Sequence, residues 1–196
     1  MYLKEKFKII RAITTSREFL NNSNDGIKCI HYGDIYKHYK NKIISHQQII
    51  NSFKLNVKES RIIKNDSIIF PDVTETISDF GVFTLVKSKK EYVNGTHTFS
   101  LTEISNNGEL NYLFYYLQAP SNRKRLQNLL LGTTVFQISL KDLEKFELLN
   151  YHDKEKQQHI IDIIGSIDEK IENNNSIIEK SNELLNYYFK ELYSSN

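Results

Sequence analysis

The C-terminal segment, residues 153–196, carries the pattern that most constrains the fold. Its apolar residues recur in steps of three and four, except at two steps that Asn174 and Ser181 occupy. This spacing forms a stripe along one helix face, typical of a coiled-coil seam. The stripe comprises Ile160, Ile164, Ile167, Ile171, Asn174, Ile178, Leu185, Tyr188 and Leu192. A helix of roughly 40 residues reaches about 60 Å, so we predict a spacer or dimerisation helix. Asn174 could set the register of the seam, or it could face solvent.

A chain of 196 residues has room for one ordinary domain beside this helix. We therefore expect two parts, a globular domain over residues 1–152 and the long helix over residues 153–196. Short alternating and helix-periodic segments, separated by turn residues, fill the first part. The predicted fold class is α+β: a globular head of short strands and helices, followed by one long C-terminal α-helix.

Local patterns assign the elements of the head. An amphipathic helix is predicted over residues 1–21 and a turn over 21–26, and residues 36–57 form a polar, helical or looped insert. Two further helices are predicted at residues 111–117 and 123–131, the second with Ser121 as its N-cap and Gly132 at its end. Strands are predicted at residues 27–31, 67–70, 81–86, 91–93, 96–101, 135–138 and 146–149. The strands on either side of Asn94-Gly95 are expected to meet around that turn.

Several functional classes find no support in the sequence. A single cysteine, Cys29, excludes an internal disulfide framework. No stretch approaches the roughly 20 apolar residues of a membrane span, and the charged N-terminus does not resemble a signal peptide, so we expect a soluble cytoplasmic protein. The spacing of His31, His38 and His46 matches no metal site. A methyltransferase's glycine-rich cofactor loop is also absent. We predict no catalytic residue, cofactor or metal, and interpret Asp168-Glu169-Lys170 as helix surface charge.

The order of motifs resembles the DNA-specificity (S) subunit of type I restriction–modification enzymes. The matching pieces are Gly26–Ile30 with Gly33-Asp34-Ile35, Lys64–Ile69, Asp72–Glu75, Gly95-Thr96-His97-Thr98, Tyr112–Leu117, Gly132–Ser139 and Gln157–Ile160. The chain departs from the family pattern at four places. Asn65 stands for Gly, Thr96 for Leu and Lys156 for Glu, and the Leu-Pro before the spacer helix is missing.

The resemblance implies the function. Family members commonly carry two target-recognition domains and two spacer helices, whereas this chain has one of each, which implies a half-subunit. It would bind double-stranded DNA and dock a methyltransferase subunit, with or without a restriction subunit. Two copies pairing their helices antiparallel would form a homodimer that reads a gapped palindrome. The alternatives are pairing with a different half-subunit, or a truncated or regulatory module that binds the methyltransferase without specifying DNA.

Charge indicates where DNA would bind. The net charge is +2, yet residues 153–196 hold nine acidic residues against five lysines, so the head is the more basic part. Lysines would neutralise phosphates, arginines could read guanine, and the polar insert has groups that suit base edges. The candidates are Lys87, Lys89, Lys90, Arg123, Lys124, Arg125, His38, Lys40, Lys42, Gln47 and Gln48. Each set could instead be a solvated surface. His97 is predicted to be structural, with direct DNA contact as the alternative.

Overall fold

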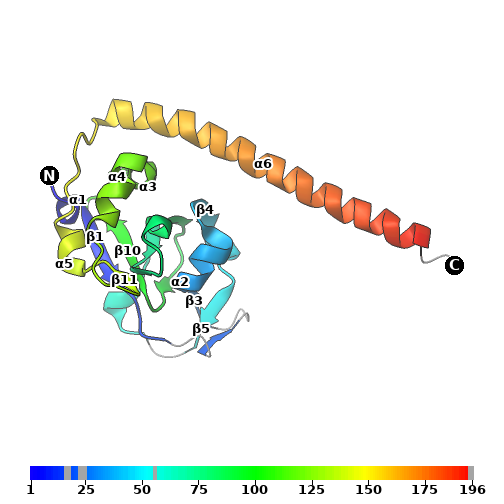
Figure 1. The fold of residues 1–196 in the computed structure, drawn as a ribbon, viewed down its shortest axis with the longest axis horizontal. Coiled ribbons are helices and arrows are strands. Elements are labelled where there is room, and N and C mark those ends of the chain that lie inside the picture. The colour runs from blue at the N-terminus through cyan, green and yellow to red at the C-terminus, as the bar shows by residue number, and fades with distance from the viewer. Residues whose placement is uncertain (16–18, 22–25, 55–56, 194–196) are drawn as a thin grey trace. The chain divides into compact units, whose positions relative to one another are not determined.

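The computed structural model describes residues 1–15, 19–21, 26–54 and 57–193 (Figure 1). It divides the chain into two units, Met1–Tyr151 and His152–Asn196. We call the first unit the head and describe each unit by itself. Short strands and helices build the head, and one long helix builds the second unit, so the predicted α+β fold class is confirmed.

A five-stranded central sheet organises the head. Its strands lie in the order β1-β10-β6-β8-β4, and all neighbours are antiparallel except the parallel pair β8 and β4. The strands are β1 (Phe7–Arg11), β10 (Thr98–Glu103), β6 (Ser67–Pro71), β8 (Thr84–Lys87) and β4 (Lys42–Ser45). Every residue of β6 is buried, which explains why this strand lacks polar alternation. The sheet is therefore covered on both faces at its centre.

Two smaller sheets accompany it. One has the order β2-β5-β3-β9, with β3 and β9 parallel, and the other pairs β11 with β7. Their strands are β2 (Leu20–Asn21), β5 (Asn51–Phe53), β3 (Ile27–Ile30), β9 (Tyr92–Asn94), β7 (Val73–Thr74) and β11 (Phe136–Gln137). The buried cluster that contains Ile69 of β6 also contains Ile30 of β3 and Tyr92 of β9. The four-stranded sheet thus packs on one face of the central sheet.

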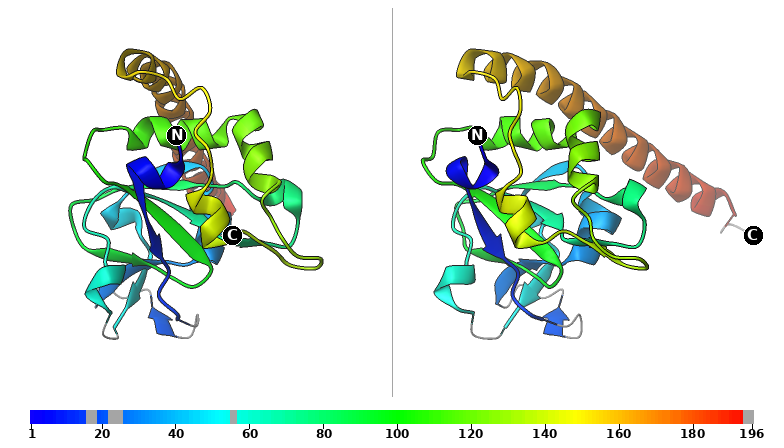
Figure 2. Two further views of the ribbon diagram at one scale, coloured as in Figure 1. Left: turned by 90° about the vertical axis from the view of Figure 1, so that its left-hand side faces the viewer. Right: turned by 60° about the vertical axis from the view of Figure 1, so that its left-hand side comes forward.

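One of the helices, α3, covers the other face. The α-helices of the head are α1 (Leu3–Lys6), α2 (Tyr32–Asp34), α3 (Leu110–Gln118), α4 (Pro120–Gln127) and α5 (Leu140–Glu144). Helix α3 packs on β6 and β8 with α4 next to it, as Figure 2 shows. Single turns are the π-helix η2 (Ile35–Tyr39) and the 3-10 helices η3 (His46–Gln48), η4 (Glu59–Arg61) and η5 (Ile77–Asp79). Seven of the nine residues of α3 are buried, so its aromatic composition reflects packing.

Some sequence predictions are wrong. The helix over residues 1–21 is instead the single turn α1 followed by β1 and β2, because β10 offers an edge on which Phe7–Arg11 pairs in full register. Residues 22–25 of the predicted turn lie outside the described residues. Strands β9 and β10 belong to different sheets, so no hairpin forms around Asn94-Gly95.

The helical boundaries near α4 and the last predicted strand also differ. Pro120 occupies the first turn of α4 and Ala119 is its N-cap, in place of Ser121. The helix ends at Gln127, and Gly132 opens a loop with φ +129°. Of the predicted strand 146–149, only Glu147 forms a β-bridge, and its partner is Tyr2. Helix α5 ends just before this segment and returns the chain to the N-terminal residues.

The second unit is α6 (Lys154–Tyr193), a helix of 40 residues. Twelve large apolar side chains along it are exposed, from Ile163 to Tyr193, including Ile167, Ile171, Ile178, Leu185, Tyr188 and Leu192 of the predicted seam. Apolar surface of this extent is unusual on a solvated helix. Among the described residues, no helix combines the length and hydropathy that a membrane crossing requires.

An ion pair ties the N-terminus of the head to α3. Lys6 Nζ lies 2.7 Å from both carboxylate oxygens of Glu109. The Glu109 side chain is only 8% exposed, whereas that of Lys6 is 29% exposed. Loss of the lysine would leave a buried carboxylate unpaired, while loss of the glutamate leaves an ammonium that reaches water.

We therefore expect Lys6→Met to lower the free energy of unfolding by about 3 kcal/mol, and Glu109→Gln by about 1 kcal/mol. Urea denaturation of the full chain measures both, with Lys4→Met at an exposed neighbouring lysine as the control. A larger loss for Glu109→Gln than for Lys6→Met would contradict this account.

Candidate nucleic-acid interface

The predicted DNA-binding residues fall in three separate places. Strands β4 and β8 run parallel, with Lys42 beside Thr84 and Ser45 beside Lys87. The first set, His38, Lys40 and Lys42, therefore lies where β4 begins, and we call it the basic edge. The second set, Gln47, Gln48, Lys87, Lys89 and Lys90, gathers where β4 and β8 end. The third set, Arg123, Lys124 and Arg125, lies on α4.

The basic edge presents its side chains to solvent. His38, Lys40 and Lys42 are all exposed. Hydrogen bonds hold the turn that carries them. The hydroxyl of the buried Tyr39 donates to the carbonyl of Gln48 at 2.8 Å. Asn41 has a left-handed backbone (φ 54°) and its Oδ1 accepts from the backbone N–H of Phe83 at 3.1 Å. A rigid turn thus holds cationic side chains outward, as contact with phosphates requires.

At the other end of β4, part of the set is engaged within the head. Lys87 Nζ lies 3.1 Å from the Asp66 carboxylate. Gln48 Oε1 accepts from the backbone N–H of Ser45 at 2.7 Å, which caps η3. Gln47, Lys89 and Lys90 are exposed. These three therefore keep their side chains available, whereas Lys87 and Gln48 have structural partners.

The arginines of α4 are also engaged. Arg123 donates from Nε to the carbonyl of Phe80 at 2.8 Å and from Nη2 to that of Ser78 at 2.7 Å. Arg125 donates to the carbonyl of Glu147 at 2.7 Å, and its guanidinium lies 4.7 Å from the Phe146 ring centre. Of the three, Lys124 is exposed, and Arg123 and Arg125 are partly buried. The two arginines join loops to α4, a use that their sequence pattern did not reveal.

A groove of about 390 Å³ contains none of the predicted DNA-binding residues. It lies where β6 ends and β10 begins, and its acidic and aromatic lining combines segments far apart in the chain. The lining residues are Tyr32, Tyr36, Val73, Thr74, Glu75, Thr76, Asp79, His97 and Val135. Below we call this site the groove.

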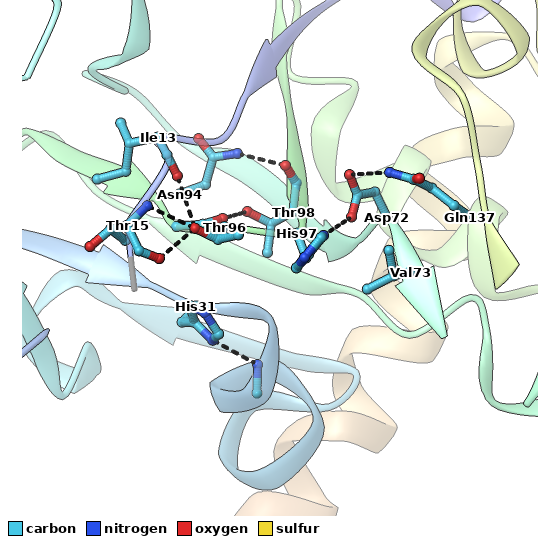
Figure 3. Close-up of polar contacts among 12 residues, drawn as sticks. Ile13, Thr15, His31, Asp72, Val73, Asn94, Thr96, His97, Thr98 and Gln137 are labelled. Carbon is cyan, nitrogen blue, oxygen red and sulfur yellow. Dashed lines mark hydrogen bonds and ion pairs between the residues drawn. The ribbon is translucent and has the colours of Figure 1, made fainter. Parts of the chain in front are cut away.

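His97 is held at the groove by a short polar network (Figure 3). Its Nδ1 lies 3.5 Å from Oδ1 of Asp72, and Nε2 of Gln137 donates to Oδ2 of Asp72 at 3.4 Å. The Tyr32 ring packs edge-on against the imidazole, with ring centres 5.8 Å apart. Burial raises the pKa of Asp72, and the neighbouring His97 and Gln137 oppose that shift. Half of the His97 side chain is exposed, and its structural role stays a prediction.

The residues on either side of His97 explain how this turn is fixed. Thr96 Oγ1 accepts from the backbone N–H of Thr15 at 2.8 Å and donates to the carbonyl of Thr15 at 2.5 Å. Thr98 Oγ1 donates to the carbonyl of Gly95 at 2.5 Å. The sequence did place His97 in a recognisable motif, but only the fold brings Asp72, Gln137 and Val135 to it. Within the described ranges, no cluster of three or more His, Cys, Asp or Glu could hold a metal ion.

The protein is of the α+β class: a head of short strands and helices is followed by one long helix with an apolar stripe. The model of the type I restriction modification DNA specificity domain matches residues 3–183. The chain belongs to this family.

Individual relatives agree in fold and differ in length. The chain is 33% identical over 86 residues to a curated Mycoplasma genitalium protein named as a type I specificity subunit, across 44% of this chain and 22% of that protein. The crystal structure of a type I restriction-modification S subunit from M. genitalium superposes with a TM-score of 0.65 at 18% identity, covering 99% of this chain and 45% of that one. The HsdS subunit from Thermoanaerobacter tengcongensis superposes with a TM-score of 0.53 at 14% identity, covering 92% and 39%. The chain thus spans less than half the length of these relatives.

The contacts of Arg123 predict a structural role. We expect Arg123→Lys to lower the free energy of unfolding by about 1–3 kcal/mol, because lysine cannot reach two carbonyls with a fixed fork of donors. Lys124→Ala on the same helix is the control and should change it by less than about 0.5 kcal/mol. Thermal and urea unfolding measure both. Unchanged stability of Arg123→Lys would mean that the guanidinium is not bound as described.

Proposed function

We propose that this chain is a sequence-specific DNA-recognition subunit of a type I restriction–modification complex and docks a methyltransferase subunit through α6. Membership of the DNA specificity domain family, across residues 3–183, is the observation that carries this proposal. The protein itself performs no chemistry in this scheme. It selects the DNA on which its partner acts.

The charge distribution of the head supports DNA binding. The basic edge and the exposed Gln47, Lys89, Lys90 and Lys124 offer cations and amides to phosphates. Lys87 and Gln48 contribute by holding the turns next to the exposed Lys89, Lys90 and Gln47. Arg123 and Arg125 join neighbouring loops to α4, the helix that carries Lys124. Phosphate contacts of this kind position DNA without reading its sequence, so base recognition needs a second surface.

The exposed stripe of α6 supports helix pairing. A second copy could cover it in antiparallel fashion, which is an isologous arrangement with a two-fold axis. Ile160, Ile164, Ile167, Ile171, Asn174, Ile178, Leu185, Tyr188 and Leu192 would form the seam. Two heads related by that axis would read the same half-site on opposite strands, a gapped palindrome. A 40-residue helix sets an upper limit of about 18 base pairs on the separation.

The DNA role predicts which lysines matter. In a complex of the full chain with its cognate methyltransferase subunit, Lys40→Ala and Lys42→Ala should each weaken duplex DNA binding for every sequence and lower the salt slope by about one. Fluorescence anisotropy at several salt concentrations measures this. Lys141→Ala, at an exposed lysine of α5, is the control. A complex that assembles but never binds DNA would support the regulatory alternative and contradict the proposal.

The homodimer predicts a specific response of the seam. Light scattering should give about twice the 23.1 kDa of one chain, and Ile178→Lys should shift the mass to that of the monomer. The control is Ile177→Lys. Ile177 and Ile178 are 61% and 57% exposed, so within one chain the two substitutions disturb similar environments, but only Ile178 lies on the seam. Equal effects of the two variants, or a monomeric parent chain, would argue against the antiparallel dimer.

A further inference from the structure

The groove has a lining that suits base edges and disfavours phosphates. Glu75 and Asp79 contribute carboxylates, and threonines and tyrosines contribute hydroxyls. Carboxylates repel a phosphate, but they accept hydrogen bonds from amino groups. Val135, at its rim, is 54% exposed and offers methyl groups. Methyl groups pack well against thymine.

The backbone at His97 has an unusual conformation, which a hydrogen bond from the neighbouring strand end stabilises. Its φ is 60°, the left-handed region that few non-glycine residues adopt. The backbone N–H of Asp72 donates to the carbonyl of His97 at 3.1 Å, which ties the end of β6 to this turn. Residues held in such conformations tend to occur at functional sites. The turn directs the imidazole to a place that ordinary strand geometry would not reach.

The carboxylate of Asp72, 3.5 Å from Nδ1, favours one tautomer of the neutral His97 imidazole. Gln137 Nε2 donates to Oδ2 of Asp72, so Oδ1 remains for His97. A carboxylate accepts only, so the neutral imidazole presents Nδ1–H to it and leaves Nε2 as an acceptor. None of the described residues donates to Nε2. The ring therefore offers one oriented acceptor at the groove.

We propose that the groove reads a base bearing an exocyclic amino group, adenine N6 or cytosine N4, with His97 Nε2 as the acceptor and Asp72 as its positioning residue. This inference rests on the proposed function and makes it specific. The basic edge would supply affinity for any sequence, and the groove would supply discrimination. Gln137 would act through Asp72 by keeping Oδ1 directed at the imidazole.

Selection from a random duplex pool, followed by sequencing, tests the first half of this inference. The full chain is used with its cognate methyltransferase subunit. The parent complex should enrich a motif, and His97→Asn should lose preference by roughly two- to tenfold at one base pair of each half-site while keeping the rest. Asparagine tolerates the left-handed backbone, so this variant preserves the turn. His159→Ala, a histidine of α6, is the control.

Base analogues test the acceptor role. At the His97-dependent pair, purine replaces adenine, or 2-pyrimidinone replaces cytosine, which deletes the amino group alone. The parent complex should lose affinity about two- to tenfold, and His97→Asn should lose nothing further, because both changes remove one hydrogen bond. Asp72→Asn should abolish this coupling as well. Circular dichroism checks that each variant folds, and His97→Asn alone suffices if Asp72→Asn does not.

The outcomes separate the two levels of the proposal. If the parent complex enriches no motif, the proposed function fails and the inference fails with it. An unchanged motif in His97→Asn, or additive losses with the amine-deleted duplexes, overturns the inference alone. Coupling that appears only when 2-aminopurine replaces guanine also overturns the inference. That analogue lacks the keto acceptor of guanine, so such coupling would mean that His97 donates a hydrogen bond.

Discussion

Burial of β6 on both faces is the constraint on which the head depends. Because this strand cannot shift without exposing Ile68, Ile69 or Phe70, the two points where it emerges from the core are fixed. An aspartate stands at each point. Asp66 pairs with Lys87 and accepts from the backbone N–H of Ser88, while Asp72 pairs with His97 and Gln137. The same buried strand therefore positions the lysine-bearing turn at one end and the groove at the other.

The division between arginine and lysine follows from their chemistry. Arg123 and Arg125 each donate to backbone carbonyls of loops next to α4, and a planar fork of donors suits that task. Lysine carries a single compact charge on a long stem and remains hydrated at the surface. Lys40, Lys42, Lys89, Lys90 and Lys124 are exposed accordingly. Counting positive residues along a chain therefore overstates the surface that nucleic acid can contact.

Long-range pairing decided what the sequence could predict. Helix α6 was predictable because its stripe repeats from Ile160 to Leu192, and β6 because it is a continuous apolar run bounded by turns. The segment 1–21 was not, since Phe7 and Ile10 fit a helix face as well as a strand and only the open edge of β10 decides between them. Local sequence patterns could not predict the groove, because its lining comes from segments far apart in the chain. Asp72 meets His97 because β6 pairs with β10, and Gln137 joins them because β11 pairs with β7.

The two units of the chain divide the proposed task in a way that explains the small size of the recognition surface. A single hydrogen bond to a base contributes only about 0.5–1.5 kcal/mol of discrimination, too little to specify a site alone. In the proposed dimer the two-fold axis presents each contact twice, so every discriminating interaction in one head counts again in the other. The seam of α6 then fixes the separation of the two half-sites, which adds a geometric condition that base contacts cannot supply. Sequence preference would come from the groove and spacing preference from the helix, so changes in one should leave the other intact.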